Sequence, residues 1–193
     1  MKDSFLYFKF YKPFGILSQF TDEDGNPGLG RVLDLPKDVY PVGRLDKDSE
    51  GLLLLTSNNT LKSRLLNPDN GHIRKYWIQV EGDITPEALE ELNRPMLLRF
   101  KGKEYRTKKA TATKIATPTL PERVPPIRFR KNVPTSWVEM TLTEGKNRQV
   151  RRMTAQTGFP TLRLIRVAFG EIKLDSLRPG EINPLTQSEF STL

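Results

Sequence analysis

Runs of apolar residues divide the chain into short predicted strands. Phe5–Phe10 is aromatic-rich and strand-like, Lys12–Gly15 has the composition of a turn, and a second short strand is expected over Ile16–Phe20. The leucines that open Leu52–Thr56 are typical of a buried strand. The pattern therefore predicts an N-terminal hairpin and a central strand.

The other predicted elements follow from apolar spacing and from helix-terminal signals. Thr85-Pro86-Glu87 predicts a helix start, with Thr85 as N-cap and an acidic first turn. Further helices are expected over residues 58–66 and about 147–157, and further strands over residues 76–80, 108–115, 137–143 and 161–169. Because strands outnumber helices and hairpins are common, we expect an α+β fold with a mixed, mostly antiparallel sheet and flanking helices.

The length and composition narrow the possible classes of protein. A chain of 193 residues suits one domain over residues 1–193, and we expect two lobes that divide near residues 70–75. It contains no cysteine, which excludes disulfides and thiolate chemistry. The longest aliphatic run, Leu52–Leu55, is far too short for a membrane span, so we expect a soluble, cytoplasmic protein without a membrane partner.

Positive charge is concentrated in one region. The net charge is +8, and between Arg99 and Arg152 there are 15 Lys or Arg residues against 4 Asp or Glu. Such asymmetry is typical of a surface that binds a polyanion, although a solvated surface would give the same count. The proline-rich stretch Ala116–Pro134 lies in this region and suits either a surface connector or an arm laid against nucleic acid. Its central basic residues are Arg128, Arg130 and Lys131.

The acidic loop Asp46–Gly51 admits a metal-binding interpretation that then fails. It matches the first half of a calcium-binding EF-hand loop, but Ser57 stands where the bidentate glutamate should be. A second candidate loop beginning at Asp22 has Leu33 at that position. The single histidine, His72, has no second imidazole with which to share a metal. We therefore expect no metal site.

Asp46 and the basic segment Lys146–Arg152 remain as candidates for chemistry. Burial at the edge of an apolar core raises the pKa of a carboxyl group, whereas a nearby guanidinium lowers it. If Arg151 points at Asp46, the carboxylate stays ionised, as a nucleophile or general base requires. A structural salt bridge between lobes would use the same pair. Basic side chains at a helix start oppose the helix dipole, and a bound phosphate would relieve that repulsion.

Several segments together resemble the cofactor-independent pseudouridine synthases that modify ribosomal RNA, the RsuA-like family. These segments are Lys12–Gly15, Gly43–Leu53, Lys75-Tyr76, Glu144–Met153 and Leu162–Arg166, in the family's order. Ser49 replaces the threonine usual in the family and keeps its hydroxyl. Many relatives begin with an RNA-binding S4 domain, which we do not expect here because the first strand begins within ten residues. The chain looks most like the ribosomal large subunit pseudouridine synthase E group.

The resemblance implies roles for individual residues. Asp46 would be the catalytic aspartate, Tyr76 would stack on the target base, Arg151 would pair with Asp46, and Arg44 would enter the RNA helix where the uridine leaves. It also implies that a bacterial monomer acts on ribosomal RNA, with the large subunit as the expected source. The other residues expected to bind RNA are Lys12, Lys146, Arg148, Arg152, Arg128, Arg130 and Lys131.

Two other functions fit the basic surface. A non-catalytic RNA-binding or ribosome-assembly protein would use the same charges, but it has little use for a carboxylate in a phosphate-lined cleft. An RNA hydrolase would need metal-binding carboxylates or a histidine pair, and the sequence supplies neither convincingly.

Overall fold

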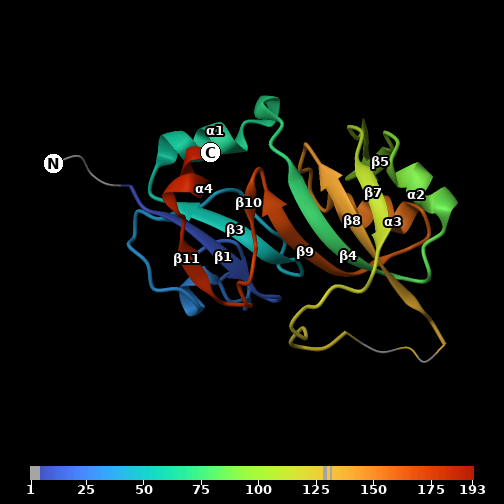
Figure 1. Ribbon diagram of the computed structural model, residues 1–193, viewed down its shortest axis with the longest axis horizontal. Coiled ribbons are helices and arrows are strands. Elements are labelled where there is room, and N and C mark those ends of the chain that lie inside the picture. Colours follow the sequence, from blue (N-terminus) through green and yellow to red (C-terminus); the bar gives the residue numbers. More distant parts are fainter. Residues whose placement is uncertain (1–4, 128–129, 131) are drawn as a thin grey trace. The chain divides into compact units, whose positions relative to one another are not determined.

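The computed structural model describes residues 5–127, 130 and 132–193, and the chain forms two compact units (Figure 1). Unit 1 comprises Met1–His72 and Ile165–Leu193, and unit 2 comprises Ile73–Leu164. The fold is α+β with a mixed, mostly antiparallel sheet, as predicted. Among the described residues, no helix is long and apolar enough to span a membrane.

A sheet in the order β11-β1-β3-β9 forms the centre of unit 1. β3 lies antiparallel to β1 and parallel to β9, with Glu50 opposite Ile165. β9 begins in unit 2 and continues into unit 1 along the chain. The strands are β1 (Tyr7–Lys12), β2 (Tyr40–Pro41), β3 (Glu50–Thr56), β9 (Thr161–Phe169), β10 (Ile172–Lys173) and β11 (Ile182–Pro184). Every residue of β3 is buried, as its leucine run predicts.

The predicted N-terminal hairpin is wrong. β1 pairs with β3 and β11, and Ile16–Phe20 forms no strand. Polar groups of that segment bond to other loops instead: the Leu17 amide donates to the carbonyl of Pro27, and the Ser18 hydroxyl donates to the carbonyl of Leu45. The leucines of β3 offer β1 a more apolar partner than Ile16–Phe20 does.

Short helices complete unit 1. α1 (Asn59–Leu66) begins at the Asn58 N-cap, whose side chain accepts from the Leu61 amide, and α4 (Gln187–Ser191) lies near the C-terminus. Two 3-10 turns cover Leu29–Arg31 and Pro68–Asn70.

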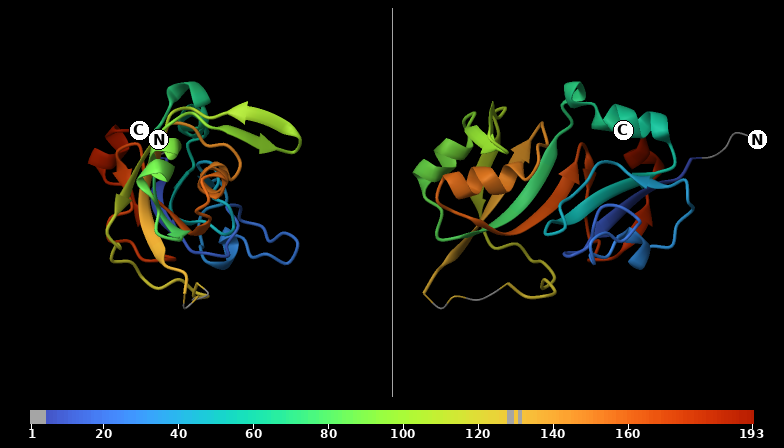
Figure 2. Two further views of the ribbon diagram at one scale, coloured as in Figure 1. Left: turned by 90° about the vertical axis from the view of Figure 1, so that its right-hand side faces the viewer. Right: turned by 180° about the vertical axis from the view of Figure 1, so that it is seen from behind.

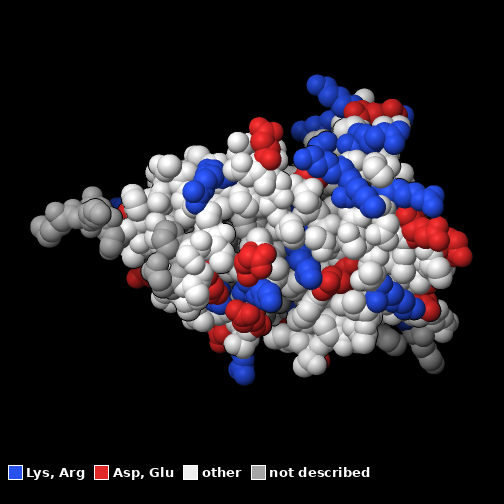
Figure 3. Space-filling model, turned by 45° about the horizontal axis from the view of Figure 1, so that its top comes forward, with Lys and Arg blue, Asp and Glu red and all other residues white. Residues whose placement is uncertain are grey.

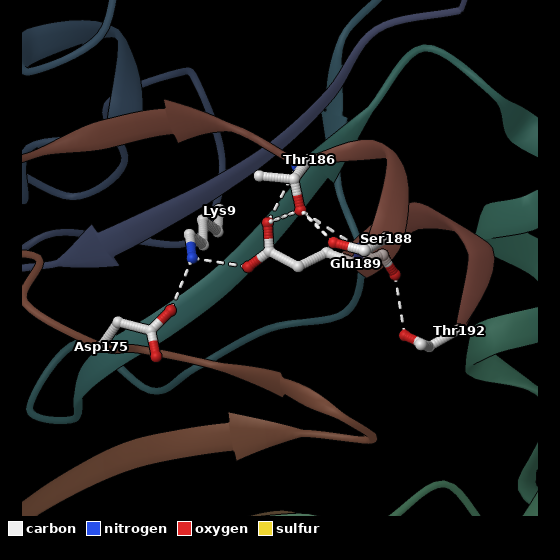
Figure 4. Close-up of polar contacts among 6 residues, drawn as sticks. All are labelled: Lys9, Asp175, Thr186, Ser188, Glu189 and Thr192. Carbon is white, nitrogen blue, oxygen red and sulfur yellow. Dashed lines mark hydrogen bonds and ion pairs between the residues drawn. The ribbon is translucent and has the colours of Figure 1, made fainter.

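A buried lysine connects α4 to the sheet of unit 1. Lys9 Nζ lies 2.7 Å from Asp175 Oδ2 and 2.6 Å from Glu189 Oε1 (Figure 4). Burial lowers the pKa of Lys9, but hydrogen bonds and charges from the two carboxylates outweigh it and raise the pKa above its ordinary value. For Glu189 the directions are reversed, because burial raises the pKa of a carboxyl group. Hydrogen bonds from Lys9 and Thr186 and the charge of Lys9 outweigh burial, so the pKa of Glu189 is lowered.

Unit 2 is built on antiparallel strands in the order β4-β8-β7. Thr85 caps α2 as predicted, accepting from the Ala88 amide, and Asn93 ties the end of α2 to Ala112 in β7. The elements are β4 (Arg74–Glu81), α2 (Pro86–Leu92), β5 (Leu97–Phe100), β6 (Lys103–Arg106), β7 (Thr111–Ile115), β8 (Thr135–Leu142) and α3 (Gln149–Gln156). β5 and β6 form a separate hairpin that projects from the other strands of unit 2 (Figure 2).

Candidate active site

Asp46 lies in the loop between β2 and β3, and the backbone on its N-terminal side is fixed by one hydroxyl. Ser18 Oγ accepts from the Leu45 amide at 3.0 Å and donates to the Leu45 carbonyl at 2.8 Å. Ser18 is buried, so water does not compete for these bonds. Asp46 itself is half-buried, and its carbonyl accepts from the Ser49 amide at 3.0 Å.

The backbone on the C-terminal side of Asp46 is fixed by the segment that follows β1. The Lys47 carbonyl accepts from the Gly15 amide at 2.8 Å and from Lys12 Nζ at 3.5 Å. Lys12 also donates to the carbonyls of Pro13 at 3.0 Å and Ile16 at 2.7 Å. Asp46 therefore stands between two residues whose backbone groups are bonded to a distant part of the chain.

Lys12 is not placed as an RNA-binding residue. Its side chain is completely buried, 0% exposed, and its ammonium group faces carbonyl oxygens of its own unit. Burial lowers the pKa of Lys12 to about 7, while the charges of Glu50, Asp48 and Asp46 act to raise it. The expectation that Lys12 contacts RNA is therefore wrong, and the lysine instead supports the loop that carries Asp46.

Other residues of the Asp46 loop differ in exposure. Arg44 is exposed and can be reached by a large ligand. Lys47 is also exposed, and its ammonium donates to the side-chain oxygen of Asn26. Within the residues that the structure describes, no three His, Cys, Asp or Glu side chains gather as a metal site would require. A half-buried carboxylate on a loop whose backbone is held can serve as a nucleophile or a general base.

Tyr76 and Arg151 belong to unit 2. Tyr76 lies on β4 opposite Met140 of β8 and is 8% exposed. Arg151 lies in the first turn of α3, is half-buried, and donates to the Thr161 carbonyl at 3.4 Å. α3 begins at Gln149 rather than near residue 147, so only two of the four basic side chains of the segment lie within the helix.

The remaining basic candidates also lie on unit 2. Lys146 and Arg148 precede α3 and are exposed, whereas Arg152 is half-buried. Arg130 is exposed and pairs with Glu81 at 3.0 Å. Arg128 and Lys131, also expected to bind RNA, lie outside the described residues.

Two features of the site escape sequence reasoning. Ser18 carries no local signal, because its partner Leu45 lies 27 positions away. No strand is predicted from the sequence for the β5–β6 hairpin, because its alternating apolar positions are few, but Lys101-Gly102 is a recognisable turn signal.

Comparison with known proteins identifies the family. The family model for RNA pseudouridylate synthase matches residues 7–156. The chain is 48% identical over 172 residues to the ribosomal large subunit pseudouridine synthase E of Vibrio parahaemolyticus, covering 89% of this chain and 70% of that protein. It is 49% identical over 172 residues to the enzyme of the same name from Xanthomonas campestris, covering 88% and 90% of the two chains.

A solved structure agrees with the sequence relatives. A crystal structure of a pseudouridylate synthase matches with a TM-score of 0.80 at 29% identity, covering 98% of this chain and 74% of that one. A substrate-bound H/ACA ribonucleoprotein matches with a TM-score of 0.57 at 15% identity, covering 88% and 49%, which shows a shared fold alone. The family predicted from the sequence motifs is confirmed: the chain belongs to the RNA pseudouridylate synthases.

Proposed function

We propose that this protein isomerises a uridine to pseudouridine in ribosomal RNA of the large subunit, with Asp46 as the catalytic carboxylate. The relatives named as large subunit enzymes, at 48% and 49% identity, support the substrate. The observation that carries the catalytic assignment is the placement of Asp46. Its loop is bonded through the backbone of Leu45 and Lys47 to other segments of unit 1, which fixes the backbone that carries the carboxylate before any substrate binds.

The proposed reaction rearranges one nucleoside and consumes no co-reactant. The bond between ribose carbon 1′ and uracil nitrogen 1 breaks, the detached uracil rotates, and carbon 5 bonds to carbon 1′. The proton on carbon 5 is lost and nitrogen 1 gains one, so the atoms balance. Asp46 would assist the fragmentation as a nucleophile or as a base, and no cofactor is needed for either role.

Tyr76 and Arg151 of unit 2, and Arg44 of the loop that carries Asp46, would complete the site. We expect Tyr76 to stack on the target base and Arg151 to keep Asp46 ionised as its ion-pair partner. A base inside an RNA helix must be flipped out before a carboxylate can reach it, at a cost of about a few kcal/mol. The exposed Arg44 would occupy the space that the uridine leaves. We expect the protein to act as a monomer in the bacterial cytoplasm, where ribosomal RNA is made.

Asp46→Asn tests the catalytic assignment. The amide keeps the size of the side chain but cannot act as a nucleophile or base, so pseudouridine formation should fall by at least about a thousandfold while RNA binding stays near wild type. Tritium release from RNA labelled at uracil carbon 5 measures turnover, and Asp38→Asn, which neutralises an exposed carboxylate of the same unit, is the control. Turnover that survives in Asp46→Asn would refute the assignment.

The substrate is tested separately from the residue. Pseudouridines would be mapped in ribosomal RNA from cells with and without the gene, and one position in the large subunit should lose its modification when the gene is absent. Restoration by the wild-type protein but not by Asp46→Asn would assign the modification to this site. An unchanged map of the large subunit would refute the proposed substrate.

A further inference from the structure

The β5–β6 hairpin of unit 2 carries a dense group of cations that the proposed catalytic roles do not use. From Arg99 to Lys109 the chain contains six basic residues and one acidic residue, Glu104. The basic ones are Arg99, Lys101, Lys103, Arg106, Lys108 and Lys109, and all six are exposed. Figure 3 shows Lys and Arg side chains crowded together at the upper right, over the region of this hairpin.

The base of the hairpin is firmly held. The Met96 amide donates to Thr107 Oγ1 at 2.9 Å, and the Thr107 amide donates to the Met96 carbonyl at 2.8 Å. The Lys108 amide donates to Glu144 Oε1 at 2.8 Å, and Leu98 is buried. The hairpin therefore projects as an arm with an ordered base, which lowers the entropic cost of binding a ligand along it.

The aromatic rings of the hairpin already have cationic partners. The Arg152 guanidinium lies 4.3 Å from the centre of the Phe100 ring, and Lys146 Nζ lies 4.3 Å from the centre of the Tyr105 ring. Arg152 also donates to the Arg99 carbonyl at 3.2 Å. These contacts add Lys146, which precedes α3, and Arg152, which lies within it, to the charge of the arm. Each cation covers a ring face on which a nucleobase would otherwise stack.

The length of the arm, from its tip to its base, is positively charged and open to solvent. Arg99 is paired with Glu104 at 2.6 Å, but among the described residues no ion pair joins Lys101, Lys103 or Arg106 to a carboxylate. Uncompensated cations at this density attract phosphate groups, and releasing counterions from RNA then favours binding.

We propose that the β5–β6 hairpin, together with Lys146 and Arg152, binds the sugar–phosphate backbone of the substrate RNA without reading its sequence. The inference rests on the proposed function for the identity of the polyanion. Long exposed cations on a projecting arm can contact phosphates whatever the sequence, and the ring faces covered by Lys146 and Arg152 are not open for a base to stack on. The arm would supply binding energy that offsets the cost of flipping the target base.

The triple substitution Lys101→Ala, Lys103→Ala and Arg106→Ala tests the proposal. Affinity falls as salt rises, and each lost phosphate contact makes the slope of log affinity against log salt shallower by about 0.7 to 0.9. The slope of the triple variant should therefore be shallower by roughly 2 to 3. Between about 50 and about 200 mM salt, the ratio of wild-type to variant affinity should then shrink roughly 20- to 40-fold. Fluorescence anisotropy with a short labelled RNA stem-loop of arbitrary sequence measures both quantities.

A matched control removes equivalent charges from unit 1. Lys37, Lys173 and Arg178 are exposed, and their triple replacement by alanine should leave affinity and salt slope at wild-type values. If the hairpin triple variant unfolds, Lys101→Ala and Lys103→Ala carry the test singly, each lowering the slope by about one. A wild-type salt slope in the folded hairpin variants would overturn the proposal. The binding assay needs no turnover. An enzyme that fails to modify uridine would therefore refute the proposed function, but a shallower salt slope in the hairpin variants would still support RNA binding by the hairpin.

Discussion

Lys12→Met removes the buried ammonium group beneath the Asp46 loop while keeping most of the length of the side chain. In the wild type this ammonium donates to the carbonyls of Pro13, Ile16 and Lys47. The variant leaves these carbonyls without that donor, and an unsatisfied buried acceptor costs about 1–3 kcal/mol. It also removes the cost of burying a charge, so the free energy of unfolding depends on pH differently in the two proteins.

The pH dependence follows from the pKa of Lys12. Burial lowers that pKa from 10.5 to about 7 in the folded protein, so between these values the unfolded chain binds a proton that the folded chain has lost. The cost of burying the charged ammonium group destabilises the wild type in full below pH 7, and this cost diminishes as the pH rises towards 10.5. Each pH unit inside the window is worth about 1.4 kcal/mol. From about pH 7 to about pH 9, the wild type should therefore gain about 2 kcal/mol relative to Lys12→Met.

Urea denaturation at the two pH values measures this difference. All other titrating groups are shared by the two proteins, so their contributions cancel in the double difference, provided that Lys12 does not perturb them. The free energy of unfolding of the wild type should rise with pH relative to that of Lys12→Met. Parallel dependence on pH would refute the reasoning, because it would mean that Lys12 remains protonated in the folded state throughout this range.

Two further substitutions test the packing of unit 1. Gly51→Ala would place a Cβ 2.4 Å from the Arg166 carbonyl oxygen at a φ of +101°. Urea denaturation should show that the free energy of unfolding falls by about 3 kcal/mol or more. For the control Gly170→Ala, where no atom lies within 4 Å of the new Cβ, it should fall by about 1 kcal/mol. Glu189→Gln removes a carboxylate whose pKa is lowered by Lys9, so its destabilisation should be largest above pH 4.5 and shrink as the pH falls below it; thermal denaturation at about pH 6 and about pH 3 checks this, and a constant difference would contradict it.

Local sequence patterns predicted the elements whose signals lie within themselves. The all-buried β3, the Thr85 cap of α2 and the whole length of β9 were all predicted correctly. The strand expected over Ile16–Phe20 failed because pairing is decided by partners elsewhere in the chain, and the leucines of β3 are the better partner for β1. The same reason hid the ion pair between Lys9 and Glu189 of α4, since it joins residues 180 positions apart.

The active-site prediction shows the same division between local and distant information. The motif identified Asp46 and the family, but it suggested RNA contact for Lys12, because a lysine near an RNA site is easily read as a phosphate ligand. Burial decides otherwise: Lys12 is 0% exposed and Ser18 is 6% exposed. A buried ammonium or hydroxyl is tolerated when hydrogen bonds satisfy it. One acceptor of Lys12, the Lys47 carbonyl, and the acceptor of Ser18, the Leu45 carbonyl, belong to the loop that carries the carboxylate.

This arrangement separates two tasks within the molecule. Lys12 and Ser18 hold the backbone of the Asp46 loop in unit 1, so the carboxylate needs little ordering when substrate arrives. The excess cations of the β5–β6 hairpin lie in unit 2 and take no part in those bonds. Because the backbone of the loop is ordered before RNA binds, phosphate contacts made by unit 2 need not offset the cost of ordering it. They can offset the cost of flipping a base out of its stack instead. A positioned carboxylate cannot perform that step by itself.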